Sequence, residues 1–257
     1  MPEKNLREIA TARQAEQQGL EARLYCCAST ACMSSGGGTG LADVLREGIA
    51  AHGLEGRVAV TPTGCMGLCS LGPLLRVEVA GRLPVLYTEV DLMLGRLILA
   101  EHVAKAVDAE EFALPPFFEE HVLPLDIPFF QDQTKVVLAD SGRIDPERIE
   151  DYLAADGYAA LEKVLTEMTG EQVIEWIAAS GLRGRGGGGY PTGMKWRHAR
   201  AAESVEGEKF IICNADEGDP GAYMDRSILE GNPQAVLEGM LIAAYAAGAT
   251  EGWFYIR

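Results

Sequence analysis

The arrangement of four cysteines constrains this chain more than any other feature. Five of the six cysteines lie in the stretch from Cys26 to Cys69, and four of them form two pairs, Cys27-x4-Cys32 and Cys65-x3-Cys69. Each pair follows a segment with the pattern of a β-strand. Because loops that follow adjacent strands can meet, we expect the four thiolates to converge on one point. Four soft thiolates at one point suit either a zinc ion or an iron–sulfur cluster.

The spacing and the surroundings of these cysteines favour an iron–sulfur cluster. Structural zinc sites usually use the tighter Cys-x2-Cys pair. The flanking segments are rich in glycine, which lets backbone N–H groups approach bridging sulfides, and they read ACMSSGGGTG and TGCMGLCSLGP. Two alternatives stay open, a zinc site and four small buried residues without a ligand. Cys26 is out of phase with Cys27 along the strand, so we expect it in the core, and we expect the same of Cys213.

Charge and hydropathy exclude several function classes. With 22 Lys and Arg against 38 Asp and Glu, the formal charge is -16, so the long-range field would repel a nucleic-acid backbone. The N-terminus lacks the apolar core of a signal peptide, and the best apolar run, 239–249, is too short to span a bilayer. We therefore predict a soluble cytoplasmic protein with reduced thiols, no transmembrane segment and no nucleic-acid partner.

The order of predicted elements indicates an α/β protein with two domains. Residues 21–107 read as strand, helix, strand, hairpin and helix, which is a small α/β layer. Four prolines then interrupt regular structure. The predicted ranges are 1–107 for the first domain, 108–130 for a Pro-rich linker and 131–257 for the second domain.

The second domain is predicted to begin with a short strand at 135–138 and to continue mainly with helices. Its last elements are a strand at 209–213, a helix at 233–247 and a strand at 253–256, which predict a parallel βαβ unit. Such a sheet needs further strands and a second covering layer. We therefore expect the 257 residues to be part of a longer protein.

A glycine-rich loop lies in the second domain and reads GLRGRGGGGYPTGMKW over 181–196. Gly184, Gly186 and Gly189 formally match G-x-G-x-x-G, but a predicted helix precedes them where a dinucleotide fingerprint needs a strand. Glycines let a backbone approach a flat ring or a phosphate closely, and Lys195 with the two loop arginines supplies positive charge. Tyr190 could stack on an aromatic ring. A plain flexible linker is the alternative.

A second polar loop, Asn214 to Asp225, follows the predicted strand at 209–213. Ligands of α/β sheets bind beyond the carboxyl ends of strands. The carboxylates and the amide of this loop could hold ribityl or ribose hydroxyls. A calcium loop and a solvated turn are the alternatives, although the spaced ligands and closing Glu of a calcium loop are missing.

The two loops together resemble a known family. The segments GLRGRGGGGYPTGMKW and ICNADEGDPGAYMDRSILEGNP are similar to the two signature segments of the NADH-binding flavoprotein subunit of respiratory complex I. The same segments occur in the diaphorase subunits of NAD-linked hydrogenases and formate dehydrogenases. Residues 126–169 resemble the start of that domain in hydrogenase-type members, which carry an N-terminal thioredoxin-like [2Fe-2S] domain.

The resemblance implies a fold, an activity and a set of cofactors. The implied fold is a thioredoxin-like ferredoxin domain followed by an incomplete Rossmann-like α/β domain that binds FMN and NADH. The implied activity is that of an NADH dehydrogenase or diaphorase, in which hydride passes from NADH to FMN and single electrons pass to iron–sulfur clusters. The implied partners are NADH and other iron–sulfur subunits of a multisubunit redox complex. A CGEETA-like flavin segment and a [4Fe-4S] motif are expected only in a C-terminal part beyond Arg257.

Residue by residue, the resemblance implies three sets of site residues. The metal ligands are Cys27, Cys32, Cys65 and Cys69; the catalytic residue is Glu217; and the cofactor-binding residues are Gly184, Arg185, Gly186, Gly187, Tyr190, Lys195, Asn214, Asp216, Glu217 and Gly218. Tyr190 stands where the family more often has Phe, and Gly188 where it more often has Ala. Two rival functions stay open, a non-catalytic [2Fe-2S] electron-transfer or docking component and a zinc-binding interaction module.

Overall fold

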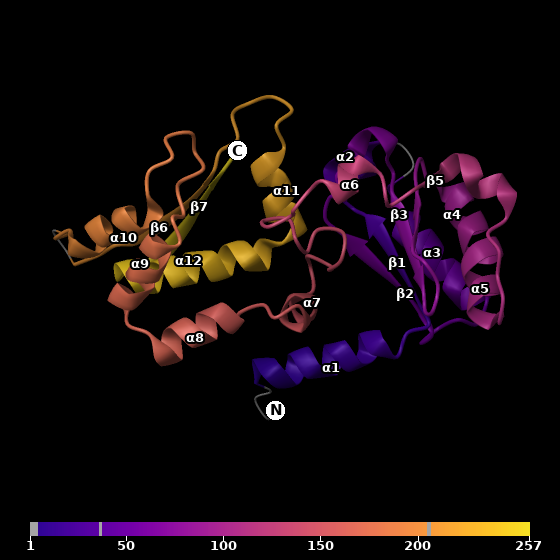
Figure 1. The fold of residues 1–257 in the computed structure, drawn as a ribbon, viewed down its shortest axis with the longest axis horizontal. Helices are drawn as coiled ribbons and strands as arrows, with labels where there is room; N and C mark the ends of the chain where they lie inside the picture. The colour runs from indigo at the N-terminus through magenta and orange to yellow at the C-terminus, as the bar shows by residue number, and fades with distance from the viewer. Residues whose placement is uncertain (1–4, 36–37, 205–206) are drawn as a thin grey trace. The chain divides into compact units, whose positions relative to one another are not determined.

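The protein is a mixed α/β chain that divides into two compact units. The computed structural model describes residues 5–35, 38–204 and 207–257. Unit 1 comprises the chain up to Ala155 together with Ser227–Asn232, and unit 2 comprises Asp156–Arg226 together with Pro233–Arg257 (Figure 1). Among the described residues, no helix combines the length and the apolar character needed to cross a membrane.

Unit 1 is built on a five-stranded mixed sheet of order β2-β1-β3-β4-β5. The strands are β1 (Ala22–Cys27), β2 (Val58–Thr63), β3 (Leu75–Val79), β4 (Val85–Tyr87) and β5 (Val122–Leu123). β1 runs parallel to β2 and antiparallel to β3, while β4 pairs antiparallel with both β3 and β5. Cys27 is in register with Thr63, so both cysteine-bearing loops start from the same end of the sheet.

Helices cover this sheet and connect its strands (Figure 1). The α-helices of unit 1 are α1 (Leu6–Gln18), α2 (Thr30–Ser34), α3 (Leu41–Ala51), α4 (Leu92–Ile98), α5 (Ala104–Asp108), α6 (Pro128–Gln131) and α7 (Ile149–Ala154). Alternate residues of β1 face opposite sides of the sheet. Leu24 and Cys26 therefore join the larger core, whereas Tyr25 and Cys27 join a smaller apolar cluster with Met66.

The segment between α5 and α7 differs from its sequence-based prediction in two places. The predicted strand at 135–138 is wrong, because these residues form a bend and turns in which Val136 and Val137 are 78% and 64% exposed. The Pro-rich segment contributes β5 and the fully buried Phe118 to unit 1. The compact units divide after Ala155. The ranges 1–107, 108–130 and 131–257 stay a prediction of domain organisation.

Unit 2 contains a small parallel sheet with helices packed beside it. Its elements are α8 (Ala159–Glu167), α9 (Gly170–Ala179), α10 (Thr192–Ala201), β6 (Phe210–Ala215), α12 (Pro233–Ala247) and β7 (Glu251–Ile256). β6 and β7 pair in parallel, as predicted for the βαβ unit. Thr169 and Gln172 form the predicted capping box at the start of α9. Helix α11 (Met224–Gly231) begins in unit 2 and ends in unit 1.

Buried His102 should make unit 1 sensitive to acid. It lies in a π-helical segment, η2 (Leu99–Val103), is 4% exposed, and its Nδ1 lies 2.8 Å from the hydroxyl of Tyr87. Burial, with a smaller contribution from Arg82, lowers the pKa of His102 from 6.5 to about 4. The unfolded chain therefore binds this proton at a higher pH than the folded chain. The contribution is complete above pH 6.5 and is lost as pH falls towards 4.

We expect the free energy of unfolding to fall by about 3 kcal/mol between pH 6.5 and pH 4, because the buried imidazole stays neutral in the folded chain. Urea unfolding at a series of pH values measures this fall, with the variant His102→Gln compared with the native chain. The difference between the two curves should shrink as pH falls. The variant His52→Gln, which changes an exposed histidine, is the control and should leave the pH dependence unchanged. Parallel curves for His102→Gln and the native chain would contradict the assignment.

Candidate functional site

The four predicted ligand cysteines come from two loops at one end of the unit 1 sheet. Cys27 ends β1, Cys32 lies in α2, Cys65 follows β2 by two residues and Cys69 begins the 3-10 turn η1 (Cys69–Leu71). The sulfurs of Cys65 and Cys69 are 3.6 Å apart. None of the cysteines forms a disulfide. The structure therefore brings the two predicted pairs to the same end of the sheet.

Interactions among the thiols link the two pairs. The neighbouring Cys32 and Cys65 lower the pKa of Cys27, while Cys27 and burial raise the pKa of Cys32 and Cys65. The Cys65–Cys69 contact extends this chain of sulfurs to the fourth residue. Cys27 is buried, whereas Cys69 is exposed at the surface.

The donor set fits a thiolate-bound centre, although the residues are not arranged around a single ion. Two thiolates bound to one tetrahedral metal at about 2.3 Å lie roughly 3.8 Å apart, which is close to the 3.6 Å of Cys65 and Cys69. Within the described ranges, no group of three or more His, Cys, Asp or Glu side chains has the geometry of a ligand set for a metal ion. The assignment of all four cysteines as ligands stays a prediction.

The other two cysteines lie apart from these four. Cys26 belongs to the larger apolar core on the opposite face of the sheet, and its sulfur contacts the backbone oxygen of Thr61 at 3.8 Å. Burial raises the pKa of the Cys26 thiol to about 12, so Cys26 is a protonated core residue in the folded protein. Cys213, in β6, is only half-buried, because the sheet of unit 2 has two strands and leaves part of each strand uncovered.

The glycine-rich loop of unit 2 is a narrow turn held by its own backbone. Arg183 and Pro191 form an isolated antiparallel bridge. The amide of Gly184 donates to the carbonyl of Tyr190 at 2.8 Å, and the guanidinium of Arg183 donates to the carbonyl of Gly189 at 2.6 Å. Gly189 has φ of 58°, a left-handed value that favours glycine. The loop is therefore an ordered turn of unit 2 that is held by its own hydrogen bonds.

The tip of this loop presents bare backbone to open space. A Cβ placed at Gly186, Gly187 or Gly188 would meet no other atom within 4 Å. A Cβ placed at Gly184 would lie 4.0 Å from the ammonium of Lys195, so this cation lies beside the loop. Exposed amides next to a fixed cation suit a phosphate or the face of a flat ring.

Tyr190 lies at the base of the loop beside helix α10. Its ring is 43% exposed, and its hydroxyl lies 3.5 Å from Nδ1 of His198. The exposed ring can stack on an aromatic ligand. The contact with His198 fixes the position of the phenol and was not anticipated from the sequence.

The acidic loop begins at the carboxyl end of β6, where the sequence placed it. The side-chain oxygen of Asn214 accepts from the amide of Asp216 at 3.0 Å, and Asp216 pairs with Arg257 at 3.0 Å. Gly218 lies near the same arginine. The acidic and glycine-rich loops emerge on the same side of unit 2, the upper side in Figure 1.

Glu217 has a structural role that the sequence did not reveal. Its carboxylate accepts hydrogen bonds from the first amides of α11, those of Met224 at 2.5 Å, Asp225 at 3.3 Å and Arg226 at 3.4 Å. A carboxylate at a helix N-terminus satisfies amides that have no partner within the helix. Glu217 precedes α11 by seven residues, across a loop. This spacing is wider than that of a local capping motif, so the sequence pattern alone does not reveal the cap.

Gly193, at the start of α10, is packed directly against helix α9. A Cβ at this position would lie 2.6 Å from the backbone nitrogen of Ala178. We expect Gly193→Ala to lower the free energy of unfolding by about 1–3 kcal/mol, because backbone must move to admit the methyl group. Gly186→Ala, in open space, is the matched control and should change it by less than about 0.5 kcal/mol. Equal unfolding curves for the two variants would show that α9 and α10 are packed less closely.

Comparison with known proteins relates this part of the chain to a family. Residues 177–257, which contain both loops, match the family model of the Nuo51 FMN-binding domain. The C-terminal part of the chain is therefore similar to this family, as the two loop motifs predicted.

Three curated relatives illustrate the similarity. The NADP-reducing hydrogenase subunit HndC of Solidesulfovibrio fructosivorans is 51% identical over 49% of this chain and 25% of that protein. An NADH-quinone oxidoreductase subunit of Aquifex aeolicus is 49% identical over 42% of this chain and 25% of that protein. The NAD-reducing hydrogenase HoxS subunit alpha of Cupriavidus necator is 56% identical over 34% of this chain and 14% of that protein. The matched regions thus cover at most about a quarter of these relatives.

Proposed function

We propose that this chain is the electron-input part of a redox complex, in which NADH is oxidised by FMN and single electrons leave through iron–sulfur clusters. The observation that carries the proposal is the match of residues 177–257 to an FMN-binding family, over the segment that contains both loops. Relatives that match part of the chain are named as subunits of hydrogenases and of NADH-quinone oxidoreductases. The proposed enzyme class is an NADH dehydrogenase of the diaphorase type.

The glycine-rich loop is the proposed flavin cradle. The bare backbone of Gly186 and Gly187 would lie against the ring or the phosphate, with Gly184 beside it, and Lys195 and Arg185 would supply positive charge. FMN, when bound, supplies the conversion between a hydride and single electrons. Tyr190 would orient the nicotinamide by stacking.

The acidic loop is the proposed polar wall of the same site. Asn214, Asp216 and Gly218 would position hydroxyls of the cofactor through their side chains and backbone. Glu217, the proposed catalytic residue, already holds the first amides of α11. Its carboxylate would therefore couple the start of this helix to nucleotide binding. The parallel pair β6 and β7 supports a Rossmann-like arrangement for this domain.

Unit 1 is the proposed [2Fe-2S] domain, with Cys27, Cys32, Cys65 and Cys69 as ligands. The strand order β2-β1-β3-β4, with β1 parallel to β2, supports a thioredoxin-like fold. The proximity of their sulfurs at one end of the sheet supports the ligand set. Analysis of iron, acid-labile sulfide and zinc tests the assignment, because a zinc-binding module would contain zinc without sulfide.

The proposed setting is the cytoplasm, within a complex that contains other iron–sulfur subunits. The proposed domain ranges remain 1–107 and 131–257, joined by 108–130. A non-catalytic electron-transfer or docking component is the second candidate function. The four clustered cysteines of unit 1 would serve that function without a working flavin site.

Anaerobic titration with NADH tests the proposed activity. The protein that carries this chain is loaded with FMN, and its visible flavin absorbance is followed as NADH is added. We expect the flavin absorbance to bleach on reduction. A bound flavin that keeps its colour in excess NADH would contradict the proposal and favour the non-catalytic candidate.

Lys195 should contribute strongly to flavin retention. A charge-assisted contact is worth more than a neutral hydrogen bond, so Lys195→Ala should weaken FMN binding by about tenfold or more. The quenching of FMN fluorescence on binding measures the affinity. Lys163→Ala removes a cation that lies over the Trp176 ring and is the control, with an affinity close to that of the native protein. Equal losses in both variants would count against a direct contact of Lys195.

A further inference from the structure

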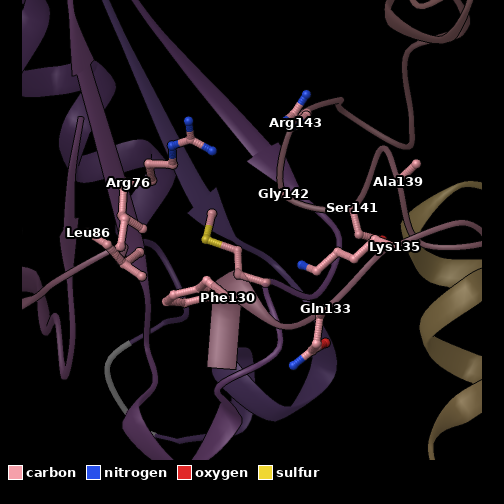
Figure 2. A pocket seen from close by; sticks show the side chains of 11 residues that line it. Arg76, Leu86, Phe130, Gln133, Lys135, Ala139, Ser141, Gly142 and Arg143 are labelled. Carbon is pink, nitrogen blue, oxygen red and sulfur yellow. The ribbon is translucent and has the colours of Figure 1, made fainter. Parts of the chain in front are cut away.

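A cavity in unit 1 is lined by none of the residues proposed above as metal ligands or cofactor contacts. Its volume is about 500 Å³. The side chains that line it come from the loop after β2, from strands β3 and β4, and from the segment between β5 and α7 (Figure 2). Cavities of this size hold small organic molecules in other proteins.

The cavity is lined by positive charge although the chain as a whole is acidic. Arg76, Lys135 and Arg143 all line it, in a protein with a formal charge of -16. In Figure 2, Arg76 of β3 and Lys135 of the facing segment extend towards the space between them. One guanidinium nitrogen of Arg76 pairs with Glu78. No ion pair between described residues involves Lys135 or Arg143.

Two buried polar atoms at this cavity have no hydrogen-bond partner among the described residues. They are Nε of Arg76 and the hydroxyl oxygen of Ser141. Ser141 is only 7% exposed, so solvent does not readily replace the missing partner. Buried polar groups in native proteins are nearly always paired, and both of these groups can donate. Both residues thus line the cavity and carry a donor that no described residue accepts from.

The remaining wall of the cavity is apolar. Met66, Leu86, Leu125 and Phe130 line it. Met66 and Leu86 are buried, and Leu125 and Phe130 pack against them in the same apolar cluster. A ligand that filled the cavity would therefore combine an anionic group with a hydrophobic body.

We propose that this cavity binds a small organic anion with an aromatic or aliphatic body and a phosphate or carboxylate group. The anionic group pairs with Arg76 and Lys135, and the body packs against Met66 and Phe130. This site belongs to unit 1, whereas the proposed flavin site belongs to unit 2. The inference therefore does not depend on flavin binding.

Calorimetric titration of the whole chain with naphthyl phosphate and with naphthoate tests the inference, and neutral naphthol serves as the comparison ligand. We expect at least one anion to bind more tightly than naphthol. Lys135→Gln should weaken this binding by about tenfold or more. Lys105→Gln removes the same charge from an exposed position of unit 1 that is paired with Glu101, and it should leave the affinity unchanged.

Three results would overturn the inference: no anion binds, naphthol binds as tightly as the anions, or Lys135→Gln and Lys105→Gln have equal effects. A preference for naphthyl phosphate over naphthoate, or the reverse, would identify the anionic group that the site takes.

Discussion

Replacement of Cys65 by serine is expected to abolish the paramagnetic signal of the reduced [2Fe-2S] cluster or to shift it markedly. The sulfur of Cys65 lies 3.6 Å from that of Cys69, and its pKa is raised by the neighbouring Cys27. Loss of one thiolate removes a quarter of the proposed ligand set, and a serine oxygen is a harder donor that suits iron–sulfur clusters less well. Electron paramagnetic resonance of chemically reduced, anaerobically purified protein measures the effect.

Cys26→Ser provides the matched control for this experiment. Cys26 is adjacent to a proposed ligand in sequence but lies in the core on the other face of the sheet. The signal of this variant should be nearly that of the native protein, although its stability should fall. If Cys26→Ser removed the signal and Cys65→Ser preserved it, the proposed ligand set would be wrong.

Replacement of Arg13 by methionine should destabilise unit 1 by about 3–5 kcal/mol. The guanidinium Nε of Arg13, in α1, donates to the carboxylate of Asp151, in α7, at 2.5 Å, and Asp151 is 1% exposed. The same carboxylate accepts from the backbone amide of Asp145 at 3.0 Å. Without Arg13, a buried carboxylate would lose its cation while remaining shielded from water. Urea-induced unfolding measures the loss.

Arg46→Met is the control for Arg13→Met. Arg46 pairs with Asp43 at 2.9 Å, but the two side chains are 51% and 75% exposed. Exposed pairs contribute about 0–1 kcal/mol, so this variant should unfold nearly as the native chain does. A loss for Arg13→Met no larger than that for Arg46→Met would mean that α1 is not anchored to α7 through this ion pair.

Features that depend on local periodicity could be predicted from the sequence. The alternation along β1 placed Cys26 in the core and Cys27 on the opposite face, and both appear there. Thr169 and Gln172 predicted the start of α9, because a capping box is a local pattern. The parallel pairing of β6 and β7 followed from the helix between them.

Features that depend on distant partners could not be predicted. Lys135 to Leu138 have the composition of a strand, but Val136 and Val137 are exposed and the segment forms turns, because strand formation needs a neighbouring strand. Arg13 and Asp151 are 138 residues apart, and no local pattern links them. The cavity of Figure 2 is likewise assembled from side chains of separate elements.

Glu217 shows the same limit within the candidate site. The resemblance to the flavoprotein family placed it near the nucleotide, and that role stays a prediction. The structure adds that its carboxylate caps α11. A substitution at this position would therefore disturb the helix start as well as any bound cofactor, so Lys195 and Cys65 are the sharper positions for testing the proposed function.

Anaerobic reduction by NADH, followed by electron paramagnetic resonance, tests the central claim most directly. The protein that carries this chain is loaded with FMN and its clusters, and NADH is added in one sample and a chemical reductant in another. The account predicts a reduced [2Fe-2S] signal with NADH, and the loss of that signal when FMN is omitted. A signal that appears with the chemical reductant, but never with NADH in the flavin-loaded protein, would contradict it.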